Sequence, residues 1–341
     1  MIERLLRPHI RELIPYSTAR DEFEGEARVF LDANENPFGG ELARYPDPRS
    51  TELRRMIAKR RSVSLESICV GNGSDEIIDL IIRAVASPGD RIAITPPTYG
   101  MYAVAARVNG VGVTECPLTS SFELDIERLS VVASERDKVL FLCSPNNPTG
   151  NQLTLDQIRG VSRMFPGLVV VDEAYIDFAK GESAVRLIEE SDRIVVIQTL
   201  SKAWGLAGAR VGIAIASPIF IAALMRMKLP YNLSALAQRV ACQRLSEPER
   251  YVEEVRLIVD ERERLRRRLG ELSAIESVYP SEGNFLLVRC RDSAAVVQRL
   301  RGSGIIVRDR GQERGCQRCV RITVGTLSEN DQLLRILEEI V

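Results

Sequence analysis

The stretch LVVVDEAYIDF, residues 168–178, decides the fold class. It begins with four consecutive aliphatic residues and reaches a carboxylate, Asp172, where the apolar run ends. A continuous apolar run of this length is typical of a strand buried on both faces of a mostly parallel sheet. In such α/β sheets the ligands bind at the carboxyl ends of the strands. The stretch therefore predicts an α/β protein with Asp172 at a ligand site, although Asp172 could instead cap the segment that follows.

Further strand-like runs alternate with helical stretches through the first two thirds of the chain. They are ICV at 68–70, RIAIT at 91–95, VGVTE at 111–115, VLFLC at 139–143, RIVVIQT at 193–199 and RVGIAIA at 210–216. One of the intervening helices begins after Thr154, which forms a capping box with Gln157. The alternation predicts a large α/β domain in which a mostly parallel seven-stranded sheet lies between helices.

The pattern changes after about residue 245. A long charged helix is expected over 247–269, followed by shorter strands and by a final helix capped by Ser328. The predicted strands are NFLLV at 284–288, IIV at 305–307 and CVRITV at 319–324. We therefore expect three parts: an N-terminal arm over 1–35 that packs with the small domain, a large ligand-binding domain over 36–245, and a small α+β domain over 246–341.

Composition indicates an ordinary soluble globular protein. The 341 residues are 45% hydrophobic and 27% charged, and the net charge of −1 gives no general attraction to nucleic acid. The most apolar tract, 211–225, is interrupted by Ser217 and Pro218, so no membrane span is expected. The first residues mix acids with bases and lack an apolar signal core, which predicts a cytoplasmic location.

Cysteine and histidine usage narrows the chemistry. The seven cysteines are scattered, most of them in apolar runs, which suits reduced and buried thiols. Cys316 and Cys319 form a single CxxC, but a zinc site needs about four ligands, so no metal is expected. Because His9 is the sole histidine, a histidine base or a Ser-His-Asp triad is not expected.

A rare lysine stands in the stretch TLSKAWGLAGAR, residues 199–210. Of the 46 basic residues only five are lysines and 41 are arginines, so the chain uses arginine almost wherever it places a cation. Lys202 could still be a surface charge. It is also a primary amine among small residues, and an amine forms an imine with an aldehyde, which a guanidinium does not.

Three other stretches follow predicted strands and suit one ligand. VGNGSDE at 70–76 opens a helix with a tight turn, which is an anion site or simply a capped turn. SPNNPTG at 144–150 offers Asn147 as a donor to a phenolate-like oxygen, or is a plain turn. TPPTYGMY at 95–102 carries Tyr99, which could stack on a flat ring or belong to the core.

Pyridoxal 5′-phosphate has all the groups that these residues suit. Asp172 would keep its pyridine nitrogen protonated, so that the ring acts as an electron sink, and Lys202 would form an imine with its aldehyde. A further set of residues would hold its phosphate, namely Gly73, Ser74, Thr199, Ser201 and Arg210.

The motifs resemble a known family. SPNNPTG, VVVDEAY and TLSKAWGLAGARVG, in this order, resemble the class II group of fold-type-I pyridoxal-phosphate aminotransferases. The segments LIPYSTAR, LDANENP, RYPDP, GNGSDE, PTYGMY, GIIVRDR and VRITVGT extend the resemblance, nearly end to end, to the histidinol-phosphate aminotransferases. Those enzymes move an amino group between glutamate and imidazole acetol phosphate in histidine biosynthesis. Trp204 departs from the pattern, because Phe or Tyr is commoner after SKA.

The resemblance implies a role for each matching residue. Lys202 is the Schiff-base lysine, Asp172 meets the pyridine nitrogen, and Asn147 and Tyr175 meet the phenolic oxygen. Tyr99 lies against the ring. Ser74, Asp75, Ser201 and Arg210 hold the phosphate. Tyr45 reaches the cofactor phosphate of the neighbouring subunit, which implies a homodimer. The substrate would be bound by Arg308, Arg321, Tyr16 and Asn147. The two arginines would hold the glutamate carboxylate and the phosphate of histidinol phosphate in turn. From residue type alone, either arginine could be a surface residue.

Other activities share this cofactor site. A threonine-phosphate decarboxylase and an aromatic aminotransferase are the alternatives within the fold. A regulator or scaffold that binds pyridoxal phosphate without turnover is the alternative from another class, but the chain shows neither a DNA-binding segment nor a basic patch.

Overall fold

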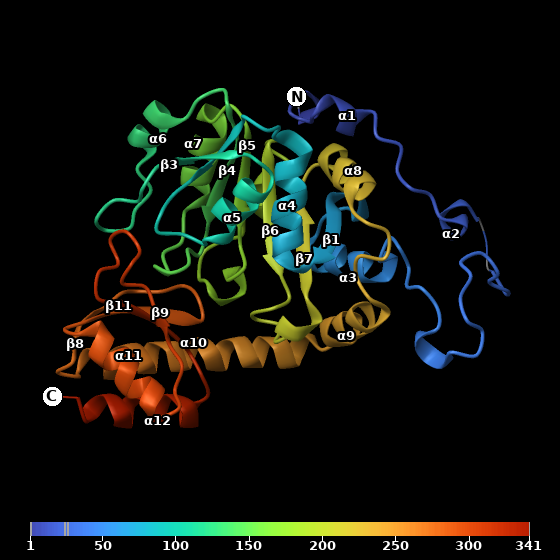
Figure 1. Ribbon diagram of the computed structural model, residues 1–341. Coiled ribbons are helices and arrows are strands. Elements are labelled where there is room, and N and C mark those ends of the chain that lie inside the picture. Colours follow the sequence, from blue (N-terminus) through green and yellow to red (C-terminus); the bar gives the residue numbers. More distant parts are fainter. Residues whose placement is uncertain (1, 24, 26, 341) are drawn as a thin grey trace.

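The computed structural model describes residues 2–23, 25 and 27–340. Figure 1 shows a large sheet between helices, a smaller helix-covered sheet at the lower left, and an N-terminal arm that runs along the right side of the molecule. The large sheet has seven strands in the order β1 (Ile68–Asn72), β7 (Val211–Ile215), β6 (Ile194–Thr199), β5 (Leu168–Asp172), β4 (Asp137–Cys143), β2 (Arg91–Ile94) and β3 (Gly112–Glu115). All neighbouring pairs are parallel except those that involve β7. The predicted sheet is confirmed.

Strand β5 lies at the centre of this sheet and is buried on both faces. Val169 and Val171 belong to one apolar cluster, whereas Leu168 and Val170 belong to another. Successive strand residues point to opposite faces, so a strand covered on both sides needs apolar residues at every position. This two-sided burial explains the run LVVVD, and Asp172 is the last residue of the strand, at the carboxyl edge of the sheet.

Helices cover both faces and link the domains. The α-helices are α1 (Pro8–Arg11), α2 (Ala19–Glu22), α3 (Thr51–Arg61), α4 (Gly73–Val85), α5 (Met101–Val108), α6 (Ile126–Val132), α7 (Leu155–Met164), α8 (Pro218–Met227), α9 (Ala235–Leu245), α10 (Pro248–Gly270), α11 (Ser293–Gly302) and α12 (Leu327–Glu338). Short 3₁₀ helices are η1 (Ile2–Arg4), η2 (Gly40–Leu42), η3 (Leu65–Ser67), η4 (Ile176–Phe178), η5 (Ala184–Leu187) and η6 (Ala207–Ala209). The capping box of Thr154 and Gln157 at the start of α7 is confirmed. None of the helices in the described part of the chain is long and apolar enough to cross a membrane.

The small domain is an antiparallel sheet with helices on one side. Its strand order is β10 (Arg308–Asp309), β11 (Cys319–Thr323), β9 (Phe285–Cys290) and β8 (Ile275–Val278). The expected strand over 305–307 is wrong, because pairing starts only at Arg308. The expected cap at Ser328 is also wrong: Thr326 accepts from the N–H of Glu329 and forms the capping box of α12.

The two faces of the small sheet differ. Leu286, Val288, Val320 and Ile322 belong to the small domain's apolar core. Residues on the other face of β9 and β11, such as Phe285 and Leu287, belong instead to apolar clusters that include residues of the large domain. The face of the small sheet that carries Arg321 therefore turns toward the large domain.

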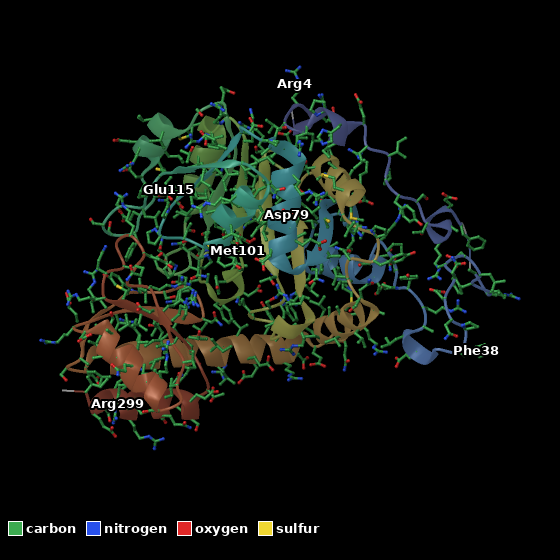
Figure 2. The ribbon with its side chains drawn as sticks, in the orientation of Figure 1. Arg4, Phe38, Asp79, Met101, Glu115 and Arg299 are labelled. Atoms are coloured by element: carbon green, nitrogen blue, oxygen red, sulfur yellow. The ribbon has the colours of Figure 1, made fainter. Side chains whose placement is uncertain are left out.

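The arm begins on the large domain. Ile2, Leu6 and Ile10 are buried in the same apolar cluster as residues of α4 and α8. Residues 2–10 thus pack against the large domain, because the four-residue spacing of their apolar side chains makes an apolar face that α8 covers. We had expected the arm to pack with the small domain. The arm continues beyond its predicted limit at 35, to about residue 45. The described residues from 13 to 45 expose large apolar side chains, and Phe38 projects into solvent at 94% exposure (Figure 2).

Candidate active site

Asp172 is a buried carboxylate with neutral partners. Its Oδ2 accepts a hydrogen bond from the Tyr102 hydroxyl at 2.7 Å, and its Oδ1 accepts from the Ala174 N–H at 3.1 Å. Burial raises the pKa of Asp172, and these two hydrogen bonds oppose that rise. A buried carboxylate held by neutral donors suits a ligand that brings a positive charge or an N–H donor.

Lys202 lies in the loop between β6 and β7. Its Nζ is 5.7 Å from the centroid of the Tyr175 ring. Burial lowers the pKa of Lys202 and so does the positive charge of Arg321, while Asp172 opposes them. A lower pKa leaves a larger fraction of the amine unprotonated at neutral pH, and the unprotonated amine is the form that attacks an aldehyde.

The backbone forms a tight cradle where the start of α4 meets the start of β7. The Gly73 N–H donates to the Arg210 carbonyl at 2.9 Å, and both residues have positive φ angles, +77° and +55°. A Cβ on Gly73 would lie 2.4 Å from Arg210 Nη2, and one on Gly212 would lie 2.3 Å from the Gly73 carbonyl carbon. The Gly212 contact is with backbone, which cannot move aside, whereas at Gly73 the Arg210 side chain could shift and the positive φ is what disfavours a Cβ. Ser74 follows in the first turn of α4, where backbone N–H groups have no acceptor within the helix.

Two hydroxyl groups lie at the end of β6 and just after it. Thr199 Oγ1 lies 2.9 Å from Ser201 Oγ and accepts from the Ser201 N–H at 3.1 Å. Thr199 Oγ1 also donates to the Val211 carbonyl at 3.0 Å. The Ser201 hydroxyl, the Arg210 guanidinium and the start of α4 therefore make a set of donors that matches a phosphate group.

The Asp75 carboxylate contacts two neighbouring side chains, those of Tyr99 and Arg210. Its Oδ1 accepts from the Tyr99 hydroxyl at 3.0 Å, and its Oδ2 lies 3.4 Å from Arg210 Nη2. We expected Asp75 to hold a phosphate. Its carboxylate has the wrong charge for that contact, so its backbone N–H in the first turn of α4 is the group that suits an anion.

Asn147 links the large domain to the small one. Its Nδ2 donates to the Tyr175 hydroxyl at 3.4 Å, and its Oδ1 accepts from Arg321 Nη1 at 2.6 Å. The Tyr175 ring packs edge-on against Phe285 of β9 with centroids 5.0 Å apart. The structure thus brings Asn147, Tyr175 and Arg321 together beside Lys202.

The two predicted substrate arginines lie on neighbouring strands. The register of β10 and β11 places Arg308 directly opposite Arg321. Burial lowers the pKa of Arg321, and so do the positive charges of Arg310 and Arg308. Like charges opposite each other are destabilising, so this pair suits an anionic ligand.

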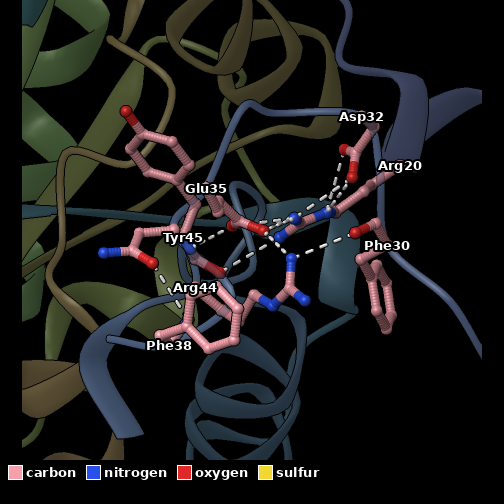
Figure 3. A network of polar contacts seen from close by, with 8 residues as sticks. Arg20, Phe30, Asp32, Glu35, Phe38, Arg44 and Tyr45 are labelled. Carbon is pink, nitrogen blue, oxygen red and sulfur yellow. Dashed lines mark hydrogen bonds and ion pairs between the residues drawn. The ribbon is translucent and has the colours of Figure 1, made fainter. Parts of the chain in front are cut away.

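The structure does not bring Tyr16 and Tyr45 to these residues within one chain. Tyr16 is exposed and lines a cavity of about 800 Å³ between the arm and α8. Tyr45 stacks on Tyr231 with ring centroids 4.5 Å apart. Figure 3 shows that the Tyr45 phenol points away from the polar network that holds its backbone.

That network fixes the conformation of the arm. Glu35 accepts from Arg20 Nη2 at 2.8 Å, from Arg44 Nη1 at 2.6 Å and from the Tyr45 N–H at 2.6 Å. Arg20 Nη1 also donates to the Tyr45 carbonyl at 3.2 Å, so both backbone groups of Tyr45 are held (Figure 3). The hydrogen bond from Arg44 is the main reason why the pKa of Glu35 falls to about 2.

Sequence reasoning missed Tyr102 and Arg310. Tyr102 stands in the quoted stretch TPPTYGMY, and a second tyrosine three residues after the predicted ring contact Tyr99 was the available signal. Arg310 Nη2 lies 3.4 Å from Asn147 Oδ1. Its alternation with Arg308 along a strand was the corresponding signal.

The CxxC pair lies near this site but is buried. Cys316 and Cys319 pack with Phe122 and Leu287. A hydrogen bond with Cys316 lowers the pKa of Cys319. Among the described residues, no group of three or more His, Cys, Asp or Glu side chains could hold a metal ion.

Comparisons with known proteins agree with this arrangement. The family profile for aminotransferase class I and II matches residues 26–337. The histidinol-phosphate aminotransferase of Parabacteroides distasonis is 46% identical over 338 residues, covering 99% of this chain and 98% of that protein. The crystal structure of the histidinol-phosphate aminotransferase from Sinorhizobium meliloti in complex with pyridoxal-5′-phosphate is 26% identical, with a TM-score of 0.82, and covers 88% of this chain and 83% of that one. The L-threonine-O-3-phosphate decarboxylase of Porphyromonas gingivalis is 27% identical, with a TM-score of 0.75, and covers 87% and 90%.

Proposed function

We propose that this chain, which belongs to the aminotransferase class I and II family, is a histidinol-phosphate aminotransferase. It would transfer an amino group reversibly between L-histidinol phosphate and 2-oxoglutarate, giving imidazole acetol phosphate and L-glutamate, in L-histidine biosynthesis. The convergence of Lys202, Asp172 and Arg321 at one site is the observation that carries the proposal. The 46% identity with a full-length relative of that name supports the choice of substrate.

The residues at the site fit pyridoxal 5′-phosphate as the cofactor. Asp172 suits the pyridine nitrogen, because its buried carboxylate has neutral donors and needs a positive partner. Asn147 and Tyr175 suit the phenolic oxygen. The phosphate matches the cradle described above, whose glycines leave no space for a Cβ. When bound, the cofactor supplies an aldehyde for amino groups and a ring that takes up the electron pair of a deprotonated Cα.

Each residue has a definite task in this proposal. Asp172, kept ionised by Tyr102, holds the proton at the pyridine nitrogen. Lys202 Nζ would take the proton from the Cα of the amino donor and pass it to the carbon that takes over the amino group, and its lowered pKa favours the uptake. Tyr175 and Asn147 orient the ring through hydrogen bonds at its oxygen.

Arg308 and Arg321, with Tyr16, would bind the anionic group of each substrate. A guanidinium pairs well with both a carboxylate and a phosphate, so one site serves glutamate and histidinol phosphate in turn. Because Tyr16 lies on the arm, its participation requires the arm to change position or to come from another subunit.

The functional unit in this proposal is a homodimer in the cytoplasm. Tyr45 stacks on Tyr231 and not on a residue predicted to hold its own chain's cofactor, and the exposed apolar side chains of the arm suit burial against a second copy. In the dimer Tyr45 would reach the partner's cofactor phosphate. Sedimentation equilibrium tests the dimer, and cell fractionation tests the location.

Turnover tests the activity. The purified protein with glutamate and imidazole acetol phosphate should yield 2-oxoglutarate, and its visible spectrum should change when histidinol phosphate is added. A rate no higher than with other keto acids would disprove the substrate assignment. The likeness to the Porphyromonas decarboxylase makes phosphothreonine the necessary comparison, because release of carbon dioxide would favour that activity instead. Relative rates on phenylpyruvate test the aromatic alternative.

A further inference from the structure

Arg310 shares a face of the small sheet with Arg308 and Arg321. The Arg310 N–H donates to the Cys319 carbonyl at 2.9 Å, so strand pairing continues past the end of β10. Residues two apart on a strand point to the same face, and so do residues directly opposite each other on paired strands. Three guanidinium groups therefore gather on the face that turns toward Asn147.

Two of these guanidiniums converge on one neutral oxygen. Arg321 Nη1 and Arg310 Nη2 both donate to Asn147 Oδ1, at 2.6 and 3.4 Å. Among the described residues, the one carboxylate that bonds to either of them is that of Glu313, which accepts from Arg310 Nη1. The cluster therefore keeps an excess of positive charge.

Several buried polar atoms in this cluster lack a partner. The Nε atoms of Arg310 and Arg321 are shielded from solvent and have no acceptor among the described residues, and Glu313 Oε2 has no donor there. Buried polar groups are nearly always paired in folded proteins. The two Nε–H groups therefore point to an acceptor that a bound ligand supplies.

We propose that Arg310 is a specificity-determining residue that binds the phosphate group of histidinol phosphate, and that Glu313 holds its side chain in position. The inference rests on the proposed function and names one more residue of its anion site. A phosphate ester carries between one and two negative charges at neutral pH, whereas a carboxylate carries one. The third guanidinium therefore contributes more to binding histidinol phosphate than to binding glutamate.

The holoenzyme and its Arg310→Gln variant test this assignment, with Arg314→Gln as the matched control. Arg314 lies in the same loop and is exposed. Loss of a hydrogen bond to a charged group should lower kcat/KM for histidinol phosphate about 10- to 100-fold. The value for glutamate should fall about threefold or less, and Arg310→Lys should recover part of the loss. Equal losses for both substrates, or a loss of the same size in Arg314→Gln, overturn the proposal.

Inorganic phosphate separates this proposal from the proposed function. Phosphate should inhibit the reaction of the wild-type holoenzyme with glutamate more strongly than that of Arg310→Gln, whereas glutarate should inhibit both alike. If wild-type protein fails to convert histidinol phosphate but shows this difference, the proposed substrate is wrong and the role of Arg310 in phosphate binding holds. If phosphate inhibits both proteins alike, the role of Arg310 is refuted.

Discussion

Replacement of Tyr102 with Phe removes one oxygen atom from beside Asp172 and leaves the surrounding packing in place. The Tyr102 hydroxyl donates to Asp172 Oδ2 at 2.7 Å, and its ring stacks on Phe141 with centroids 4.7 Å apart. Phe keeps the stacked ring. The variant therefore removes the hydrogen bond to Asp172, together with the contact of the hydroxyl with the Cys143 thiol, and no part of the ring packing.

The size of the effect follows from the burial of the carboxylate. A hydrogen bond to a charged group is worth about 1.5–3 kcal/mol, and about 1.4 kcal/mol corresponds to tenfold in rate. Asp172 is only 2% exposed, so water does not replace the missing donor. We expect kcat to fall about 10- to 100-fold, with little change in KM, because Tyr102 acts on the carboxylate and not on the substrate anion.

The pH dependence gives the sign of the effect. Burial raises the pKa of Asp172, and the Tyr102 hydrogen bond lowers it, so losing that bond raises the pKa further. The reaction needs the ionised carboxylate, which is lost as the pH falls. The acidic limb of the kcat profile should therefore move to higher pH in the variant, as measured by 2-oxoglutarate-dependent turnover across the pH range.

Tyr251→Phe is the matched control. Tyr251 is also a buried tyrosine that hydrogen-bonds a carboxylate, Asp177, and stacks on an aromatic ring, but it lies outside the site. It should change stability and leave the acidic limb in place. If Tyr102→Phe retains wild-type kcat and the same acidic limb, the hydrogen bond does not keep Asp172 ionised and the reasoning is refuted.

Three further changes test other parts of the site. Lys202→Ala should remove the visible absorbance of lysine-bound cofactor and nearly all turnover, both measured on the purified protein. Gly73→Ala places a Cβ 2.4 Å from Arg210 Nη2 at a φ of +77°, so the strain of about 1–2 kcal/mol should weaken cofactor binding roughly tenfold, as measured by fluorescence titration of the apoenzyme. Glu35→Gln removes a charged acceptor from the Tyr45 N–H and should weaken cofactor binding in the dimer. Hybrid dimers of one Glu35→Gln subunit and one Lys202→Ala subunit should nevertheless be more active than either parent dimer. In such a hybrid, one site combines the intact lysine of the first subunit with the intact arm of the second.

Each of these expectations has a contrary result. Wild-type turnover by Lys202→Ala excludes that amine from the reaction. An unchanged dissociation constant for Gly73→Ala means that the cradle relaxes without affecting the phosphate. Hybrids no more active than their parents would show that Glu35 supports a site within its own chain.

Most of the large domain could be predicted because its signals are local. A strand buried on both faces must be apolar at every position, and β5 satisfies this rule in four successive residues. The edge strand β10 has two residues, Arg308 and Asp309, and both are exposed and charged, so no apolar pattern marks it. The apolar run at 305–307 therefore misplaced the strand.

The position of the arm depends on a partner surface that local sequence does not specify. The apolar spacing of Ile2, Leu6 and Ile10 predicts that one side is buried, but not against which element. The structure shows them in the cluster of α4 and α8. The predicted domain limit after 245 is consistent with separate apolar cores and stays a prediction.

The reactivity of Lys202 illustrates the same boundary between local and tertiary information. The stretch TLSKAWGLAGAR identifies the amine, because arginine, which the chain uses for 41 of its 46 bases, cannot form an imine. The pKa of that amine is lowered by burial and then by Arg321, while Asp172 opposes the change. These charges come from β11 and β5, far from Lys202 in the sequence. The chemistry of Lys202 can therefore be predicted from its residue type and its sequence neighbours. The lowering of its pKa, in contrast, depends on how the fold buries it and brings β5 and β11 close to it.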